Sequence, residues 1–145
     1  AMKMFWRMYD AGHSPPVKIY NTLLGGFVGL NNALEAFRIY SMMKHFKVTP
    51  NLITYILLVD VCGQKKLCLE ISTFLMEMKY FGIAPTAALV AGLVRNAPRS
   101  DELMQIALRV TRENNISIND PNLLKVLSAY FIYKIERAKK NKDYV

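Results

Sequence analysis

Two cysteines and two histidines are the residues of this sequence best suited to metal binding or nucleophilic chemistry. Cys62 and Cys68 lie six residues apart with no second cysteine pair, a spacing that fits neither a zinc site nor a disulfide framework. His13 and His45 are far apart, and neither has another ligand at metal-site spacing. We therefore expect no metal and no cofactor, and ordinary buried thiols in a reducing compartment.

The sequence contains an acidic pair and a glycine-rich stretch, but neither forms part of a recognisable catalytic or phosphate-binding motif. Asp101 and Glu102 follow Ser100 without an identifiable catalytic partner, so we interpret them as the first turn of a helix, where carboxylates favour the dipole. The segment "LLGGFVG" at residues 23–29 lacks both the lysine of a phosphate-binding loop and a strand before it. We expect a protein that is not an enzyme.

The sequence has a formal net charge of +8, from 19 lysines and arginines against 11 acidic residues. This excess favours polyanionic partners through long-range attraction and counterion release, although a solvated basic surface would give the same count. The longest apolar stretch, Ala87 to Val94, is far shorter than the roughly 18 residues that cross a bilayer. We expect no membrane span.

A repeat in the sequence indicates which structural elements must position any binding residues. "VKIYNTLLGG", from residue 17, is restated as "LITYILLVDV" 35 residues later. The residues that recur at this step are Pro15, Pro50 and Pro85; Met8, Met43 and Met78; Leu23, Leu58 and Leu93; and Tyr20 with Tyr55. Because a fixed period of this size is typical of solenoids, we expect a stack of similar units.

Each unit has the pattern of two helices joined by a turn. Apolar residues recur at intervals of three and four over residues 33–43, and the same stripe returns over residues 68–78. A shorter apolar segment precedes each stripe, and Gly29 and Gly63 with the polar residues after them indicate the turn. Gly82 is expected to stop a helix. The sequence thus predicts an all-α solenoid of helix-turn-helix repeats of about 35 residues, stabilised by stacking.

The predicted repeats are residues 17–51, 52–86 and a divergent 87–120. Residues 1–16 match the second helix of a partial repeat, residues 121–133 the first helix of a further repeat, and residues 134–145 form a basic C-terminal tail. Because the sequence opens as if inside a helix, we expect it to be part of a longer protein. The aromatic and methionine residues assigned to the core include Phe5, Met8, Phe37, Tyr40 and Met78.

Two long segments of the sequence, "VKIYNTLLGGF...NNALEAFRIYSMMKHFKVTPN" and "LITYILLVDVC...FLMEMKYFGIAPT", resemble the pentatricopeptide repeat (PPR) family. Tetratricopeptide repeats are the nearest rival, but Tyr20 in the first helix and the closure formed by Met78, Lys79, Gly82, Ile83 and Pro85 suit the pentatricopeptide family better. The resemblance implies a right-handed superhelix whose first helices line a concave groove and read one RNA base per repeat.

The same resemblance implies the residues that would read RNA. Asn21 and Asn51 correspond to the base-reading pair of the family and resemble its pyrimidine-reading combination, cytosine ahead of uracil, while Lys18 and Ile53 flank the base. The weaker groove candidates are Ile56, Thr86, Ala91 and Asp120. They are weaker because alanine and isoleucine side chains form no hydrogen bond with a base edge. Alternatively, Asn21 is an early-helix polar residue and Asn51 a helix N-cap.

The basic tail offers phosphate contacts. It has five basic and two acidic residues, and the candidates are Lys134, Arg137, Lys139, Lys140 and Lys142. A polybasic helix end binds phosphates or is simply a solvated terminus, and both interpretations stay open. If it binds, RNA is favoured over a membrane surface, because the apolar side is needed for stacking.

Taken with the resemblance, the sequence predicts a non-catalytic, single-stranded RNA-binding segment of an organellar protein, mitochondrial or alternatively chloroplast, acting in RNA metabolism or translation. The alternative is a helical-repeat scaffold for protein or ribosomal RNA contacts in an organellar ribosome or another multi-subunit complex. A third possibility is that the segment positions a catalytic domain located elsewhere in a longer chain.

Overall fold

The computed structural model describes residues 2–143, apart from the side chains of residues 2, 99, 142 and 143, and all regular structure in this range is helical. The predicted all-α class is confirmed. The elements are α1 (Met2–Asp10), α2 (Val17–Gly29), α3 (Ala33–His45), α4 (Leu52–Gln64), α5 (Cys68–Tyr80), α6 (Ala87–Asn96), the 3-10 helix η1 (Ala97–Arg99), α7 (Asp101–Glu113) and α8 (Pro121–Asp143).

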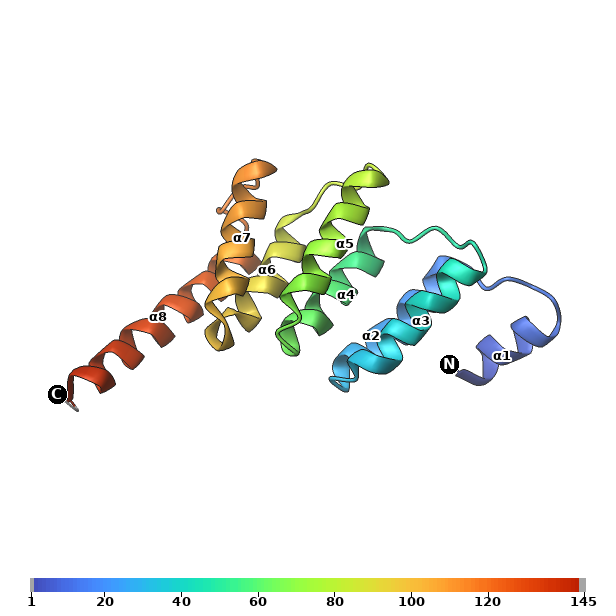
Figure 1. The fold of residues 1–145 in the computed structure, drawn as a ribbon, viewed down its shortest axis with the longest axis horizontal. Helices are drawn as coiled ribbons and strands as arrows, with labels where there is room; N and C mark the ends of the chain where they lie inside the picture. The colour runs from blue at the N-terminus through green and yellow to red at the C-terminus, as the bar shows by residue number, and fades with distance from the viewer. Residues whose placement is uncertain (1, 144–145) are drawn as a thin grey trace.

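The helices form an elongated stack with the two ends of the chain at opposite extremes (Figure 1). α2 packs on α3, α4 on α5 and α6 on α7, so each pair is a hairpin. The first helices of the hairpins also form a continuous row, in which α2 contacts α4, α4 contacts α6 and α6 contacts α8. This repetition of hairpins along one direction is the predicted solenoid.

The predicted repeats each contain one of these hairpins, and their division at these boundaries remains a prediction. Asn51 and Thr86 are the N-cap residues of α4 and α6, and α8 begins at Pro121. α8 continues without a break through Lys134, where the basic tail was predicted to start. The basic residues of the tail therefore extend a helix whose beginning packs on α6.

The second helices end in the same way in all three hairpins. A residue with positive φ follows each C-cap residue: Lys47 (56°), Gly82 (72°) and Asn115 (51°). The next backbone N–H reaches back to close the turn, as where Ile83 N donates to Met78 O at 2.8 Å. The helix stop predicted at Gly82 is confirmed, and glycine suits it because it adopts positive φ without steric cost.

The turns between first and second helices lie shortly after Gly29 and Gly63, as expected, but it is Asn31 (φ 55°) and Lys66 (φ 58°) that adopt the left-handed conformation there. Gly29 and Gly63 instead belong to the ends of α2 and α4. At Gly63 the reason is packing, since a Cβ atom would lie only 2.9 Å from Nδ2 of Asn96. This glycine permits the close approach of neighbouring first helices.

The core runs along the interior of the stack and contains the residues that recur every 35 positions. Leu58, Leu93, Met43 and Met78 are fully buried, and the corresponding Leu23 is 5% exposed. Phe5 and Tyr40 are also buried, as predicted, whereas Met8 and Phe37 are partly buried. The 35-residue period thus arises because equivalent positions in successive hairpins are buried in the core.

A polar cluster joins the first and second hairpins at the edge of this core. The Glu77 carboxylate accepts hydrogen bonds from the hydroxyl groups of Tyr40 and Tyr55, the latter at 3.3 Å, and from Lys44 Nζ at 3.1 Å. The Lys44 ammonium also lies 4.7 Å from the centre of the Tyr40 ring. Burial is the main cause that raises the pKa of both tyrosines, so both stay protonated donors to Glu77.

No helix among residues 2–143 is long and apolar enough to cross a membrane. Across the same residues, no group of three or more histidine, cysteine and acidic side chains could hold a metal ion. Both cysteines are free, and burial raises the pKa of the Cys62 thiol to about 12, which keeps it protonated and unreactive at neutral pH.

Substitution of Glu77 tests the polar cluster. Glu77→Ala leaves the buried Tyr40 hydroxyl without its carboxylate partner, so we expect the free energy of unfolding to fall by about 1–3 kcal/mol in urea denaturation. Glu136→Ala, on an exposed surface of α8, is the matched control and should change it by less than about 0.5 kcal/mol. Equal effects of the two substitutions would contradict the assigned role.

Candidate nucleic-acid interface

Asn21 and Asn51, 30 residues apart, meet where the first two hairpins join. Asn21 lies in the first turns of α2, and Asn51 is the N-cap residue of α4. Asn21 Nδ2 donates to Asn51 Oδ1 at 3.0 Å, and Thr54 Oγ1 donates to Asn21 Oδ1 at 2.6 Å. The structure therefore brings together the two residues that the sequence paired, and adds Thr54 as a third member that sequence reasoning missed.

The start of α4 fixes how the Asn51 amide is oriented. Asn51 Oδ1 accepts the backbone N–H of Thr54 at 3.1 Å, and the Asn51 N–H donates to Thr54 Oγ1 at 3.2 Å, which together form a capping box. Because Oδ1 must face this N–H, Nδ2 of Asn51 is directed elsewhere, and it donates to none of the described residues. The N-cap alternative for Asn51 is confirmed, and the amide still has free N–H donors.

The surroundings of this amide pair suit a flat, polar ligand. Asn51 is half-buried, whereas the flanking residues Lys18 and Ile53 are exposed. Lys18 and Asn21 are three residues apart on α2, and so share one helix face. Lys18 adds an exposed cation to α2 three residues before Asn21, and Ile53 adds an exposed apolar side chain to α4 two residues after Asn51. Base reading by the pair remains a prediction.

The next two junctions lack such a pair. Ile56 is half-buried and Ala91 is buried, and neither side chain can donate a hydrogen bond. Thr86 Oγ1 is buried without a hydrogen-bond partner among the described residues. Asp120 Oδ1 accepts the backbone N–H groups of Asn122 and Leu123 and so caps α8.

A groove of about 560 Å³ nevertheless crosses α4, α6 and α8 at these junctions. Its lining residues are Ile56, Asp60, Ala88, Ala91, Gly92, Arg95, Asn122, Lys125, Val126 and Ala129. Arg95 and Lys125 are exposed, and Arg95 Nη1 lies 3.7 Å from Asp60 Oδ2. The groove therefore combines weak base-reading positions with cations that can contact phosphate.

Sequence reasoning missed Arg95 and Lys125. The available signal was helical spacing, since Arg95 lies four residues after Ala91 and therefore one turn along the same face of α6. Asp60 stands in the same relation to Ile56 on α4.

The basic residues of α8 divide into one that is paired and several that are exposed. Lys134 Nζ lies 2.9 Å from Asp101 Oδ1, and hydrogen bonding with this carboxylate raises the pKa of Lys134 and lowers that of Asp101. Arg137, Lys139 and Lys140 are exposed. The side chain of the last candidate, Lys142, lies outside the described residues.

Comparison with known proteins adds the following. Residues 15–64 match the model of the PPR repeat family. Crystal structures of PPR10 share the fold: maize PPR10 has a TM-score of 0.68 and 22% identity over 99% of this chain and 21% of that one. PPR10 in complex with an 18-nt psaJ RNA element has a TM-score of 0.66 and 23% identity over 79% of this chain and 18% of that one.

Nuclear proteinaceous RNase P 2 from A. thaliana also shares the fold, with a TM-score of 0.70 and 19% identity over 90% of this chain and 28% of that one. The chain thus spans between about a fifth and just over a quarter of the length of these structures. No curated protein sequence matches it significantly. The predicted family resemblance and repeat solenoid are confirmed.

Substitution of Asn51 tests its role as a cap. Asn51→Ala removes the side-chain acceptor of Thr54 N–H, so we expect the free energy of unfolding to fall by about 0.5–2 kcal/mol in urea denaturation. Asn51→Asp is the matched control, because a carboxylate oxygen accepts the same N–H and should preserve stability. An alanine variant as stable as the aspartate variant would contradict the capping role.

Proposed function

We propose that this chain, which resembles the pentatricopeptide repeat family in sequence and shares its fold, is a non-catalytic segment that binds single-stranded RNA along the face formed by α2, α4, α6 and α8. The observation that carries this proposal is the hydrogen-bonded amide pair of Asn21 and Asn51, which retains free N–H donors and has the exposed Lys18 and Ile53 close by in the sequence. The net charge of +8 supports a polyanionic ligand. The RNA element bound to PPR10 supports RNA as that polyanion.

The Asn21 and Asn51 junction is proposed to read one pyrimidine. Asn51 Nδ2 can donate to O2 or N3 of cytosine, both of which are acceptors at the Watson–Crick edge. The exposed Ile53 side chain provides an apolar surface for the face of the base, and Lys18 provides charge for the backbone. Since the capping box orients the Asn51 amide before RNA arrives, this amide needs no reorganisation on binding.

The remaining contacts are proposed to be with phosphate rather than with bases. Ile56 and Ala91 offer no donor at the corresponding positions, whereas Arg95 and Lys125 border the groove there. Arg137, Lys139 and Lys140 extend the basic surface along α8. Phosphate contacts give affinity and position without sequence information, so specificity would rest on the first junction.

A second candidate function is a scaffold that holds ribosomal RNA or a protein in an organellar ribosome or another multi-subunit complex. The observation that favours it is the absence of a side-chain donor at Ile56 and Ala91. For either function we propose an organellar role in RNA metabolism or translation, with the mitochondrion ahead of the chloroplast. This rests on the family alone, and imaging of the tagged full-length protein in cells tests it.

The first binding experiment tests base reading by the amide pair. Asn21→Ala should weaken binding to a cytosine-containing oligoribonucleotide by about 1–3 kcal/mol and leave binding to its purine-substituted counterpart nearly unchanged, as measured by fluorescence anisotropy. Asn51→Asp keeps the cap but replaces a donor with an acceptor, which suits N3–H of uracil, so preference should move from cytosine toward uracil. Equal losses for pyrimidine and purine oligomers would make the pair structural.

The second binding experiment tests the exposed lysines of α8. If they contact phosphates, Lys139→Ala with Lys140→Ala should reduce the slope of log K against log salt by about 0.7 for each lost contact on single-stranded RNA. Lys65→Ala with Lys66→Ala, at the turn between α4 and α5, is the control pair and should leave the slope unchanged. An unchanged slope in the α8 variant would remove this helix end from the RNA interface.

A further inference from the structure

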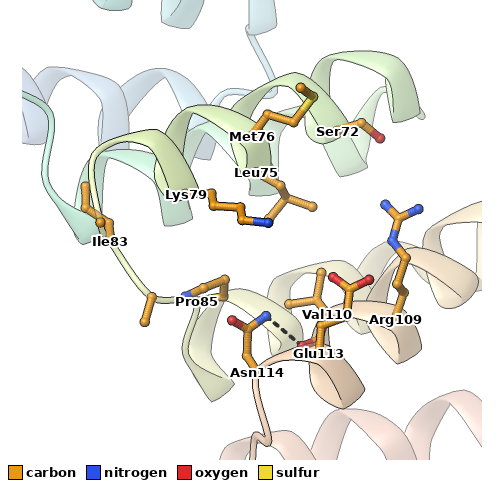
Figure 2. A pocket seen from close by; sticks show the side chains of 12 residues that line it. Ser72, Leu75, Met76, Lys79, Ile83, Pro85, Arg109, Val110, Glu113 and Asn114 are labelled. Atoms are coloured by element: carbon orange, nitrogen blue, oxygen red, sulfur yellow. Dashed lines mark hydrogen bonds between the residues drawn. The ribbon is translucent and has the colours of Figure 1, made fainter.

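A second groove lies between the second helices α5 and α7, on elements separate from those that carry Asn21 and Asn51. It has a volume of about 680 Å³ and is lined by apolar residues, including Leu75, Ile83 and Val110, together with Lys79 and Arg109 (Figure 2). An adjoining hollow of about 580 Å³ shares Ser72 and Arg109 with it and continues between the same two helices. The RNA-binding proposal makes no use of this space.

The corresponding space between α3 and α5 is filled by aromatic rings. The centroid of the Phe74 ring lies 6.2 Å from that of Phe37 and 5.4 Å from that of Tyr40. The Glu77 carboxylate closes the edge of this junction by accepting hydrogen bonds from Tyr40 and from Lys44 Nζ, the latter at 3.1 Å. The space between α3 and α5 is therefore filled by aromatic rings, and the charge of Lys44 is neutralised by the Glu77 carboxylate.

Equivalent residues in the next hairpin explain why the space is open. From α3 to α5 the step is 35 residues, so Ser72 replaces Phe37, Leu75 replaces Tyr40, and Lys79 replaces Lys44. Helix α5 therefore lacks, on the side facing α7, the two rings that α3 contributes to its contact with α5.

From α5 to α7 the step is 33 residues. It is fixed by equivalent closing hydrogen bonds, Ile83 N to Met78 O and Ile116 N to Thr111 O. At this step Ala107 replaces Phe74 and Val110 replaces Glu77. Helix α7 therefore lacks both the ring of Phe74 and the carboxylate of Glu77. The groove is the space that these groups, together with the two rings missing from α5, would occupy.

The larger hollow has an excess of positive charge, because Val110 stands where a carboxylate would be, and Glu102 lines only the adjoining hollow. Lys79 lacks the carboxylate that Lys44 has, and neither Lys79 nor Arg109 forms an ion pair with a described residue. Glu113 is the single acidic residue in the lining of the larger hollow. Figure 2 shows Lys79 extending from α5 toward the space beside Leu75, with Arg109 across from it on α7.

We propose that this groove binds a short segment of a partner protein in which an aromatic residue stands next to aspartate or glutamate. The ring fills the apolar space bounded by Leu75, Ile83 and Val110, and the carboxylate pairs with Lys79 and Arg109. Such a ligand supplies an aromatic ring and a carboxylate. Between α3 and α5 the protein provides these groups itself, the rings from Phe74 and Tyr40 and the carboxylate from Glu77. The proposal does not depend on RNA binding.

Selection of random dodecapeptides displayed on phage against the purified chain tests this proposal. The enriched peptides should share an aromatic residue next to an acidic one. Their affinity, measured with the synthetic fluorescein-labelled peptides, should fall about tenfold or more for Lys79→Glu. Lys3→Glu, at an exposed lysine of α1 outside the lining of both hollows, is the matched charge control and should leave affinity unchanged.

Filling the groove from inside provides a second variant. Leu75→Tyr with Val110→Glu places a ring and a carboxylate beside Lys79, as Tyr40 and Glu77 are placed beside Lys44, and should abolish peptide binding in a variant that circular dichroism shows to be folded. Three results would each overturn the proposal: no enriched peptides, enriched peptides without an aromatic residue beside an acid, or peptides that bind Lys79→Glu as well as the unsubstituted chain.

Discussion

A helical hairpin of this size cannot bury its apolar surfaces alone, and every other feature of the structure depends on how neighbouring hairpins pack against one another. The first helices make the continuous contact, with α4 between α2 and α6 and with α6 between α4 and α8. Gly63 permits part of this contact by leaving room for Asn96. Because the first helices are held in a row, equivalent positions on them recur at a regular interval, which a linear polymer can follow.

Stability and the proposed RNA recognition share the same atoms at the junction of the first two hairpins. The Asn51 oxygen starts α4 by accepting the Thr54 N–H, and this bond in turn directs the Asn51 nitrogen away from the helix. The amide is therefore held in place by the fold before a ligand arrives. One residue can serve both purposes because its two polar ends are chemically different.

The sequence predicted the class and the hairpins, because a repeat places equivalent residues such as Leu58 and Leu93 in equivalent core positions, whereas the pairing of Asn21 with Asn51 came from the family resemblance. It did not predict the left-handed conformation of Asn31 and Lys66, since many residue types can occupy a turn. It also missed the groove between α5 and α7. That groove arises from a 33-residue step that becomes visible only when the closing hydrogen bonds fix the register.

The length of α8 has a physical consequence of its own. At 1.5 Å per residue its 23 residues extend about 35 Å, against about 20 Å for the 13 residues of α4, and Figure 1 shows its end projecting beyond the stack. The overhang of about 15 Å exceeds the Debye length of about 8 Å at physiological ionic strength. Lys134 pairs with Asp101 at the base of this overhang, whereas the exposed Lys139 and Lys140 lie about one Debye length further out, so their field acts mainly on the surroundings of the protein.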